Sequence, residues 1–213
     1  MRVQLVMIAD KISLNKKVAA KLKKYWMRFA LLGSHCASDY SKLDRIYMAH
    51  DPWRMASPRE EYRVAETNRL ILDKFGRVGS LLEIGCGEGH QSIHLWRTCD
   101  RLVGLDVSAR AVKRARRRCR GCEFLVGDIF SSEVNAHAPY DLVVACEVLY
   151  YMSDVPAALR RMRELGRNSL VTYISREMET LDAHILSLPG VASETFEFES
   201  SRWRAAWCRH EQL

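Results

Sequence analysis

The sequence predicts an α/β fold: a seven-stranded, mostly parallel β-sheet with helices on both faces and an antiparallel hairpin at the C-terminus. Two observations support this prediction. From residue 80 onward, apolar strand-like runs alternate with segments of helical periodicity, and such alternation is typical of a parallel sheet. The segment ASETFEFESSRWRAAWCRH at 192–210 instead holds two runs of period-two alternation, which predict an antiparallel pair that closes the sheet.

Length and composition indicate one globular domain without a membrane span. The chain has 213 residues, of which 48% are apolar, enough for a sizeable core. No apolar run approaches the roughly 18 residues that a membrane-spanning helix needs. The first residues lack the order of a secretory signal, and seven cysteines form an odd set without framework spacing. We therefore expect a cytoplasmic protein in a reducing compartment.

The formal charge of +7 is confined to an N-terminal arm. Residues 1–28 hold eight Lys or Arg and one acid, whereas the remainder has 25 residues of each sign. The arm predicts a basic amphipathic helix over residues 14–32, capped by Ser13 and ended by Gly33. Such a helix can lie on a membrane, bind nucleic acid or cover the body of the protein, and the last is the preferred interpretation.

After the arm, residues 34–56 are irregular in pattern and rich in Tyr, Trp and Asp. The segment SPREEYRVAETNRLILDKFG at 57–76 then predicts a helix, with Ser57 as N-cap, Glu60 completing a capping box and Gly76 ending the helix. The face expected to turn inward carries Val64, Asn68, Ile71 and Phe75. The chain is thus divided into an N-terminal basic helix with an aromatic lid segment, 1–56, and a main domain, 57–213.

The main domain is expected to alternate between strands and helices. Parallel strands are predicted at 80–84, 101–106, 122–126, 140–146 and 168–174. Helices are predicted at 89–97, 108–119, 154–165 and 177–187. In the closing hairpin, joined at about Ser200–Ser201, Phe196 and Phe198 are expected to pair with Trp203 and Trp207.

A glycine-rich turn after the first strand predicts a cofactor site. The stretch LLEIGCGEGH at 81–90 contains G-x-G-x-G, whereas the dinucleotide fingerprint needs a glycine at position 90, where this chain has His. Glu83 stands two residues before the first glycine. A carboxylate there suits a ligand with positive charge better than a diphosphate.

Two further acids end the next two strands. Asp106 in RLVGLDVS is placed to accept hydrogen bonds from ribose hydroxyls, and Asp128 in EFLVGDIF to accept one from an adenine amine. Because the carboxyl ends of parallel strands meet at one edge of a sheet, Glu83, Asp106 and Asp128 are expected to share one site.

These residues resemble the class I S-adenosylmethionine-dependent methyltransferases, a Rossmann-like family. Their first motif, acid-x-G-x-G-x-G, is present as Glu83 to Gly89, and Asp106 and Asp128 match the ribose and adenine positions. The resemblance covers the chain from about residue 57 and implies S-adenosylmethionine as cofactor. The cofactor-binding residues it implies are Trp53, Arg54, Glu83, Gly85, Cys86, Gly87, Gly89, Asp106, Val107, Asp128, Ile129 and Glu147.

A narrower resemblance concerns the acceptor. The runs HDPWR at 50–54 and YDLVVACEVLYYMSD at 140–154 are similar to the nodulation protein S group, which methylates the free amine of a deacetylated chitooligosaccharide. The likeness implies that Trp53 and Arg54 close the pocket, with Tyr40 and Tyr47 as further lid residues. This chain departs from the group in its turn ELGRNSL at 164–170 and in its longer N-terminal arm.

The tip of the fourth strand is where class I enzymes face acceptor and sulfonium. There, Glu147, Tyr150 and Tyr151 are the candidate catalytic residues: Glu147 as proton acceptor or as cap of the following turn, and the tyrosines as groups that orient an amine or pack. The histidines show no metal-ligand spacing, so no metal site is predicted. The basic run at 110–120 is interpreted as a solvated helix face, and Cys119 and Cys122 as two small residues at a turn.

Three functions stay open from the sequence. The preferred one is N-methylation of a small amine such as an amino sugar. The second is an RNA or protein methyltransferase that docks its polymer through the basic arm, and the third is a non-catalytic module that binds S-adenosylmethionine. The acceptor atom, the pathway and the oligomeric state are not determined by the sequence.

Overall fold

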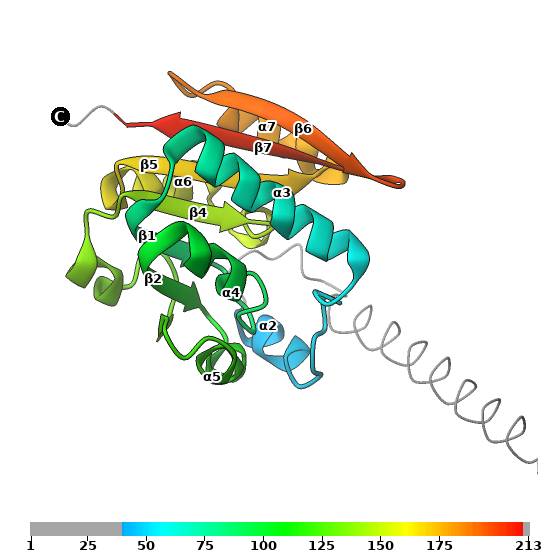
Figure 1. The fold of residues 1–213 in the computed structure, drawn as a ribbon, viewed down its shortest axis with the longest axis vertical. Helices are drawn as coiled ribbons and strands as arrows, with labels where there is room; N and C mark the ends of the chain where they lie inside the picture. The colour runs from blue at the N-terminus through cyan, green and yellow to red at the C-terminus, as the bar shows by residue number, and fades with distance from the viewer. Residues whose placement is uncertain (1–39, 211–213) are drawn as a thin grey trace, which may run out of the picture.

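The computed structural model describes residues 40–210, with side chains from Leu43 onward. The predicted helix at 14–32 and the side chain of Tyr40 therefore lie outside the described residues. The fold is a seven-stranded sheet in the order β3-β2-β1-β4-β5-β7-β6 (Figure 1). The parallel strands are β1 (Val78–Ile84), β2 (Cys99–Asp106), β3 (Glu123–Val126), β4 (Leu142–Cys146) and β5 (Asn168–Ile174). The antiparallel strands that close the sheet are β6 (Ala192–Phe198) and β7 (Ser201–Arg209).

Helices cover both faces of this sheet, as predicted. The α-helices are α2 (Tyr40–Ile46), α3 (Pro58–Phe75), α4 (Ser92–Leu95), α5 (Ala109–Arg118), α6 (Val155–Leu165) and α7 (Met178–Ile185). Short 3-10 turns are η1 (Trp96–Thr98), η2 (Ser132–His137), η3 (Leu149–Tyr151) and η4 (Ser175–Glu177). No helix within residues 40–210 combines the length and the apolar character that crossing a bilayer requires.

The core forms two main layers because successive side chains of a strand point to opposite faces. Leu81 of β1 packs with Leu70 and Ile71 of α3, whereas its neighbour Leu82 packs with Met162 of α6 on the other face. Figure 1 shows α3 crossing in front of the sheet and α6 and α7 behind it. The layers leave the carboxyl ends of the parallel strands open at one edge.

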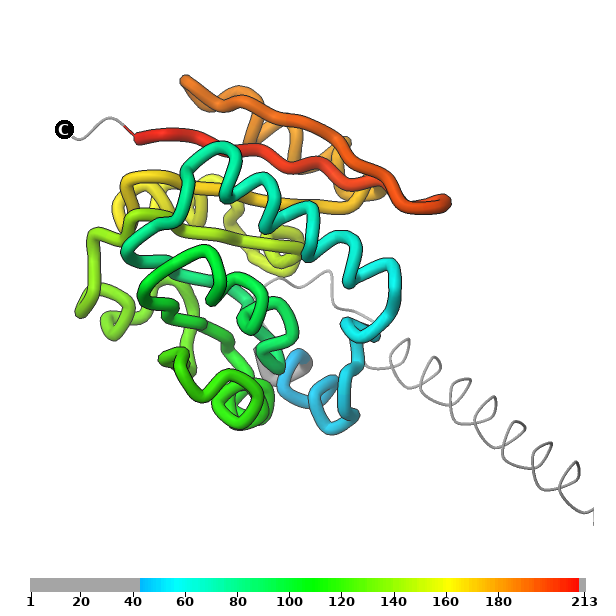
Figure 2. Tube along the Cα trace, viewed as in Figure 1, coloured from blue at the N-terminus to red at the C-terminus, as the bar shows by residue number. Residues whose placement is uncertain are grey.

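The hairpin is confirmed, but its register differs from the prediction. The turn falls at Glu199–Ser200, one residue before the predicted joint, and Glu199 takes a φ of 53°. Phe196 lies opposite Trp203, as predicted, with ring centroids 5.6 Å apart. Trp207 does not pair with Phe198, because strand register places it opposite Ala192. Figure 2 shows β7 running between β5 and β6.

Three local predictions were wrong. Part of the segment predicted as irregular is helical, as α2, and it packs against α5. Ser57 is the N-cap of α3 but makes no side-chain capping bond, and Glu60 instead pairs with Arg59 and Arg63. Finally, Cys119 and Cys122 form a disulfide at the end of α5.

Two predicted helix details also changed. The helix expected at 89–97 is reduced to α4 followed by η1, because the glycine-rich turn continues to residue 91. On α3 the buried face carries more polar side chains than predicted, since Arg63 and Thr67 are buried together with Val64 and Ile71. A buried arginine on a helix that covers a face of the sheet indicates a polar site beneath it.

Candidate functional site

A cavity of about 510 Å³ opens at the carboxyl ends of β1, β2, β4 and β5. In open α/β sheets the ligand site lies outside these strand ends, where the strand order reverses. Here the strand order reverses at β1, because β2 and β3 lie on one side of it and β4 and β5 on the other. The glycine-rich turn, the ends of β2 and β3, the turn after β4 and the segment before α3 all line this cavity.

The glycine-rich turn exposes bare backbone because a side chain would not fit. Gly85 and Gly87 have φ angles of 73° and 53°, which side chains rarely allow. A Cβ on Gly85 would lie 2.6 Å from Val148 Cγ2, and one on Gly87 would lie 2.9 Å from Tyr47 Oη. Gly85, Cys86 and Gly87 line the cavity. Gly89 does not: its α-carbon faces Ala115 of α5, where it permits close packing.

Asp106 is held at the edge of the cavity by backbone donors from two loops. Its Oδ2 accepts from Gly87 N at 2.8 Å and its Oδ1 from Ser108 N at 2.9 Å. Each carboxylate oxygen keeps a second lone-pair direction, so it can still accept a hydroxyl. Burial raises the pKa of Asp106 to about 6, against the two hydrogen bonds. Val107, next along the chain, also lines the cavity.

Asp128 lies on the same side of the cavity, at the end of β3. Its Oδ1 accepts from Phe130 N at 2.9 Å, which fixes the carboxylate relative to the loop. Ile129 is buried beside it and lines the cavity. The pairing of an apolar wall with one carboxylate is what a flat base with an exocyclic amine requires. The ligand roles of both aspartates stay predictions.

Glu83 is buried beneath the turn, with 2% of its surface exposed. Ser92 Oγ donates to its carboxylate, and the positive charge of Arg63 also acts on it. Burial raises the pKa of Glu83 to about 8, and these two partners lower it only in part. A nearby cation would favour the ionised form, as predicted for a positively charged ligand.

Glu147 and the two tyrosines meet at the end of β4. Glu147 has a φ of 56°, and its carboxylate accepts from Tyr150 Oη at 3.2 Å. Burial raises the pKa of Glu147, and Arg63 opposes that shift. Tyr151 packs its ring 4.6 Å from that of Tyr150 and 5.7 Å from that of Trp53. All four residues line the cavity, opposite the ends of β2 and β3.

The lid residues predicted from the sequence come together. Trp53 Nε1 donates to Tyr47 Oη at 3.1 Å, and both side chains line the cavity. Tyr47 is 6% exposed and lies against Gly87, so the segment before α3 rests directly on the glycine-rich turn. Arg54 also lines the cavity but is exposed, with a φ of 58°.

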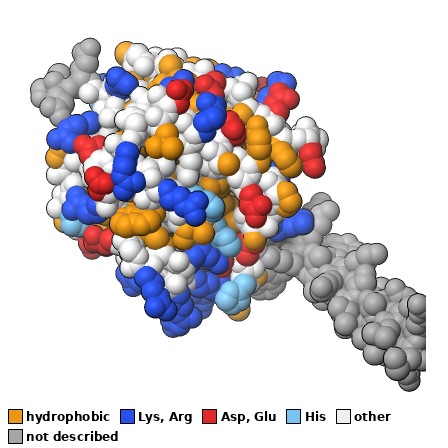
Figure 3. Space-filling view, viewed as in Figure 1, with side chains coloured by type: hydrophobic (Ala, Val, Ile, Leu, Met, Phe, Trp, Pro, Cys, Tyr) orange, Lys and Arg blue, Asp and Glu red, His pale blue; other side chains and the backbone are white. Residues whose placement is uncertain are grey.

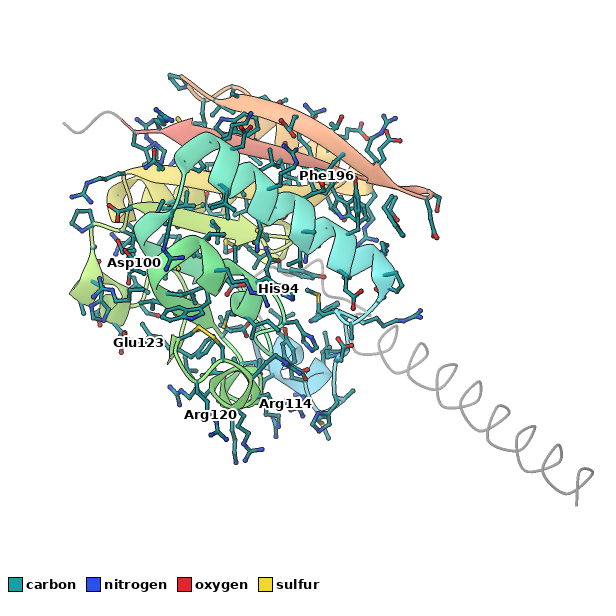
Figure 4. The ribbon with its side chains drawn as sticks, in the orientation of Figure 1. His94, Asp100, Arg114, Arg120, Glu123 and Phe196 are labelled. Carbon is teal, nitrogen blue, oxygen red and sulfur yellow. A yellow bond between two sulfur atoms is a disulfide. The ribbon has the colours of Figure 1, made fainter. Side chains whose placement is uncertain are left out.

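The basic run at 110–120 is largely the solvated face that the sequence predicted, since all its Lys and Arg side chains except Arg114 are exposed. Two of its members, Arg110 and Arg114, also fasten this lid, which the sequence did not predict. Glu88, in the glycine-rich turn, accepts from Asp51 N at 3.0 Å and from Arg114. Arg114 also donates to Ala49 O at 2.9 Å, and Arg110 pairs with Asp44 of α2. Figure 3 shows Lys and Arg gathered at the lower edge over α5, and Figure 4 shows Arg114 beside α2.

The buried arginine of α3 is the main site residue that sequence reasoning missed. Arg63 is 1% exposed, donates from Nε to Glu60 Oε2 at 2.7 Å and from Nη1 to Gln91 Oε1 at 3.0 Å, and lines the cavity. The i, i+3 spacing of Glu60 and Arg63 was visible in the sequence, but it is equally typical of exposed helix pairs. Only the fold shows that this pair is buried.

The cavity fits an adenosine cofactor that carries an amino acid and a cation. The bare turn leaves room for its backbone, two strand-end carboxylates offer acceptors, and Glu83 offers a negative charge. In addition, Gln91 Nε2 is buried at the cavity without a hydrogen-bond partner among the described residues, so it can donate to a carboxylate of the ligand. No cluster of metal-ligating side chains occurs within the described part of the chain.

Comparison with known proteins agrees with this geometry. The family model for nodulation protein S matches residues 37–181. Nodulation protein S of Sinorhizobium fredii is 36% identical over 124 residues, which cover 56% of this chain and 56% of that protein. The Rhizobium tropici protein is 37% identical over 123 residues, covering 55% and 50%. The chain thus spans about half the length of the curated relatives it matches.

Solved structures extend the similarity. The N-methyltransferase nodulation protein S from Bradyrhizobium japonicum, in complex with S-adenosyl-L-homocysteine, matches with a TM-score of 0.69 at 28% identity, covering 81% of this chain and 98% of that chain. Magnesium protoporphyrin IX methyltransferase from Synechocystis, with S-adenosylmethionine bound, matches with a TM-score of 0.61 at 17% identity and shows the fold alone; it covers 81% of this chain and 99% of that one. These matches confirm the predicted fold and the predicted cofactor, S-adenosylmethionine. The chain belongs to the nodulation protein S family of class I, S-adenosylmethionine-dependent methyltransferases.

Proposed function

We propose that this protein is an N-methyltransferase that transfers the methyl group of S-adenosylmethionine to the amine of a small acceptor, such as an amino sugar. The observation that carries the proposal is the meeting of Glu147 and Tyr150 in the same cavity as the glycine-rich turn. The similarity to a solved N-methyltransferase supports it.

Residues of β1, β2 and β3 would hold the cofactor. Asp106 would accept from the ribose hydroxyls, Asp128 from the adenine amine, and Gln91 would donate to the carboxylate of the methionine part. Glu83 would compensate positive charge from below the turn. When bound, the cofactor supplies a methyl group activated by a positively charged sulfur.

Glu147 would remove the proton that the acceptor amine has to lose. An amine attacks only through its free lone pair, so a nearby base that takes up a proton raises the reactive fraction. Because burial raises the pKa of Glu147, its carboxylate is a stronger base than an exposed one. Tyr150 orients this carboxylate through its hydroxyl, and the rings of Trp53 and Tyr151 exclude water from the site.

The size of the cavity supports a small acceptor. At about 510 Å³ it lies within the range of roughly 300 to 1,000 Å³ that is typical of pockets for one small ligand. Cofactor and acceptor must share this space, so only a small molecule, or the end of a longer one, can reach the methyl group.

Substitution of Glu147 and Tyr150 tests the proposal. Glu147→Gln and Tyr150→Phe should lower the turnover of methyl transfer to an amino sugar at least about tenfold, because both act on the acceptor side. Their affinity for S-adenosylhomocysteine, measured by calorimetry, should stay within about twofold. The wild-type rate should rise with pH and then level off, as the amine and Glu147 both lose their protons.

Glu164→Gln provides the matched control, since that carboxylate is exposed on α6 and pairs with Arg161 outside the cavity. It should change neither turnover nor affinity. Full activity of both site variants, together with a flat pH profile, would show that the acceptor needs no deprotonation at Glu147.

A further inference from the structure

The cavity has a second half that the cofactor assignments leave unused, defined here as the acceptor half. It is formed by side chains from the start of α3, the turn after β4 and η4: Arg59, Glu60, Arg63, Glu147, Tyr150 and Arg176. These elements lie away from β2 and β3, whose ends carry Asp106 and Asp128. The charged side chains of this half are therefore assigned to the acceptor.

The acceptor half contains three arginines, each of which pairs with a glutamate. Three guanidinium groups, those of Arg59, Arg63 and Arg176, face two carboxylates, those of Glu60 and Glu147. Glu60 is shared, because its Oε1 accepts from Arg59 at 2.6 Å and its Oε2 from Arg63 at 2.7 Å.

Arg176 in turn pairs with Glu177, its neighbour on η4. The three arginines therefore meet three carboxylates, but the guanidinium groups of Arg59 and Arg176 each use only one donor in these pairs.

Arg176 is the arginine best placed to meet a ligand. It stands on η4 with 67% of its side chain exposed, and its Nε donates to Glu177 at 3.1 Å. Its charge acts on Tyr150, Tyr151 and Glu147, so Arg176 lies near the residues proposed to hold the acceptor amine. No other hydrogen bond of its guanidinium occurs among the described residues, so its two terminal nitrogens can bind two oxygens side by side.

Arg59 stands on the other side of the same half. Its side chain is 44% exposed, and one terminal nitrogen is used by Glu60. The remaining donors of its guanidinium are open to a ligand in the cavity. The acceptor half thus combines a buried carboxylate for an amine with two arginines for an anion.

We propose that the acceptor carries an oxyanion, a carboxylate or a phosphate, in addition to its amine, and that Arg176 and Arg59 bind this oxyanion. The inference rests on the proposed function for the identity of the amine site. The open donors of the two guanidinium groups offer a negative group of the acceptor two points of attachment in the same cavity as Glu147. Such an attachment would fix the direction from which the amine approaches.

Binding to the complex with S-adenosylhomocysteine tests the proposal without turnover. Calorimetry would compare glucosamine with glucosamine 6-phosphate, and 3-aminopropanol with 3-aminopropanoate. The anionic member of at least one pair should bind at least about tenfold more tightly than its neutral partner. The first pair reports a preference for phosphate and the second a preference for carboxylate.

Two variants assign the preference to the arginines. Arg176→Gln and Arg59→Gln should each lower the affinity for the anionic probe at least about fivefold, and leave the neutral probe and S-adenosylhomocysteine unchanged. Arg202→Gln is the matched control, because Arg202 is an exposed arginine whose Nε also pairs with a glutamate, Glu197, but on the hairpin outside the cavity. It should bind all probes as the wild type does.

Equal binding of both members in both pairs would overturn the proposal, as would a preference that persists in Arg176→Gln and Arg59→Gln. Failure of the proposed function gives a different result. In that case no amine is methylated from S-adenosylmethionine, while the binding comparison still decides whether the acceptor half selects an anion.

Discussion

At the scale of single residues, Asp106 has two tasks that one carboxylate can perform together. Its oxygens accept from Gly87 N and Ser108 N, and the residue also lines the cavity. Asp106 therefore shapes the glycine-rich turn and, in the proposed function, also accepts from a ribose. A substitution at this position changes both.

Asp106→Ala should weaken the binding of S-adenosylhomocysteine at least about tenfold in calorimetry, because charge-assisted hydrogen bonds are lost. Asp100→Asn is the control: Asp100 starts the same strand, has 70% of its side chain exposed and lies at the far end of β2 from Asp106 (Figure 4). It should bind like the wild type. A folded Asp106→Ala variant with unchanged affinity would remove Asp106 from the cofactor site.

At the scale of elements, the glycine-rich turn and the turn after β4 are packed against each other. Val148 fills the space that a side chain on Gly85 would need, and Val148 follows Glu147 directly. The cofactor cradle and the acceptor tip therefore share one contact. A substitution in one of these two turns should therefore affect the other turn as well.

Gly85→Ala should lower the free energy of unfolding by more than the roughly 1 to 2 kcal/mol expected for a side chain at positive φ. The extra loss comes from the contact with Val148, and it should also weaken S-adenosylhomocysteine binding. Gly190→Ala separates the two effects, because Gly190 has the same φ of 73° but only Cys208 Sγ near its Cβ position, at an ordinary contact distance of 3.8 Å. Urea unfolding and calorimetry on both variants measure the difference; equal losses, with binding intact, would contradict the shared contact.

At the scale of the whole molecule, several buried carboxyl groups have raised pKa values. Burial raises the pKa of Glu83 to about 8 and that of Asp106 to about 6, and it raises the pKa of Glu147 as well. In the unfolded chain these groups titrate near about 4. Between those limits these three groups bind more protons in the folded protein than in the unfolded chain, so their contribution to stability falls as pH rises.

Between pH 6 and pH 8, the cofactor-free wild type should therefore lose at least about 3 °C in melting temperature relative to Glu83→Gln. The comparison cancels the contribution of the histidines, whose pKa values burial lowers and which act in the opposite direction. Glu83→Gln should lack this loss, because the group that titrates in this window is removed. Glu164→Gln, at an exposed ion pair, should leave it as in the wild type. The same change of melting temperature with pH in Glu83→Gln as in the wild type would show that Glu83 is ionised when buried.

The sequence by itself determined the alternation of strands and helices, the antiparallel hairpin that closes the sheet, and the acidic residues at the strand ends of the site. These features depend on local periodicity, on glycines that alone adopt positive φ, and on the rule that parallel strands end at one edge. It also indicated the lid, since Tyr47 and Trp53 lie in a segment rich in aromatic residues. Such signals need no knowledge of distant partners.

Only the tertiary structure decided how charges are used. Arg63 bonds to Gln91, 28 residues away, and Arg114 to Glu88, 26 residues away. From the sequence, Glu60 was predicted to complete a capping box and Arg114 to lie on a solvated helix face. The local sequence pattern is the same whether such a polar side chain is solvated or buried. Burial and pairing depend on which elements meet, and that is a property of the folded sheet with its helices rather than of any short segment.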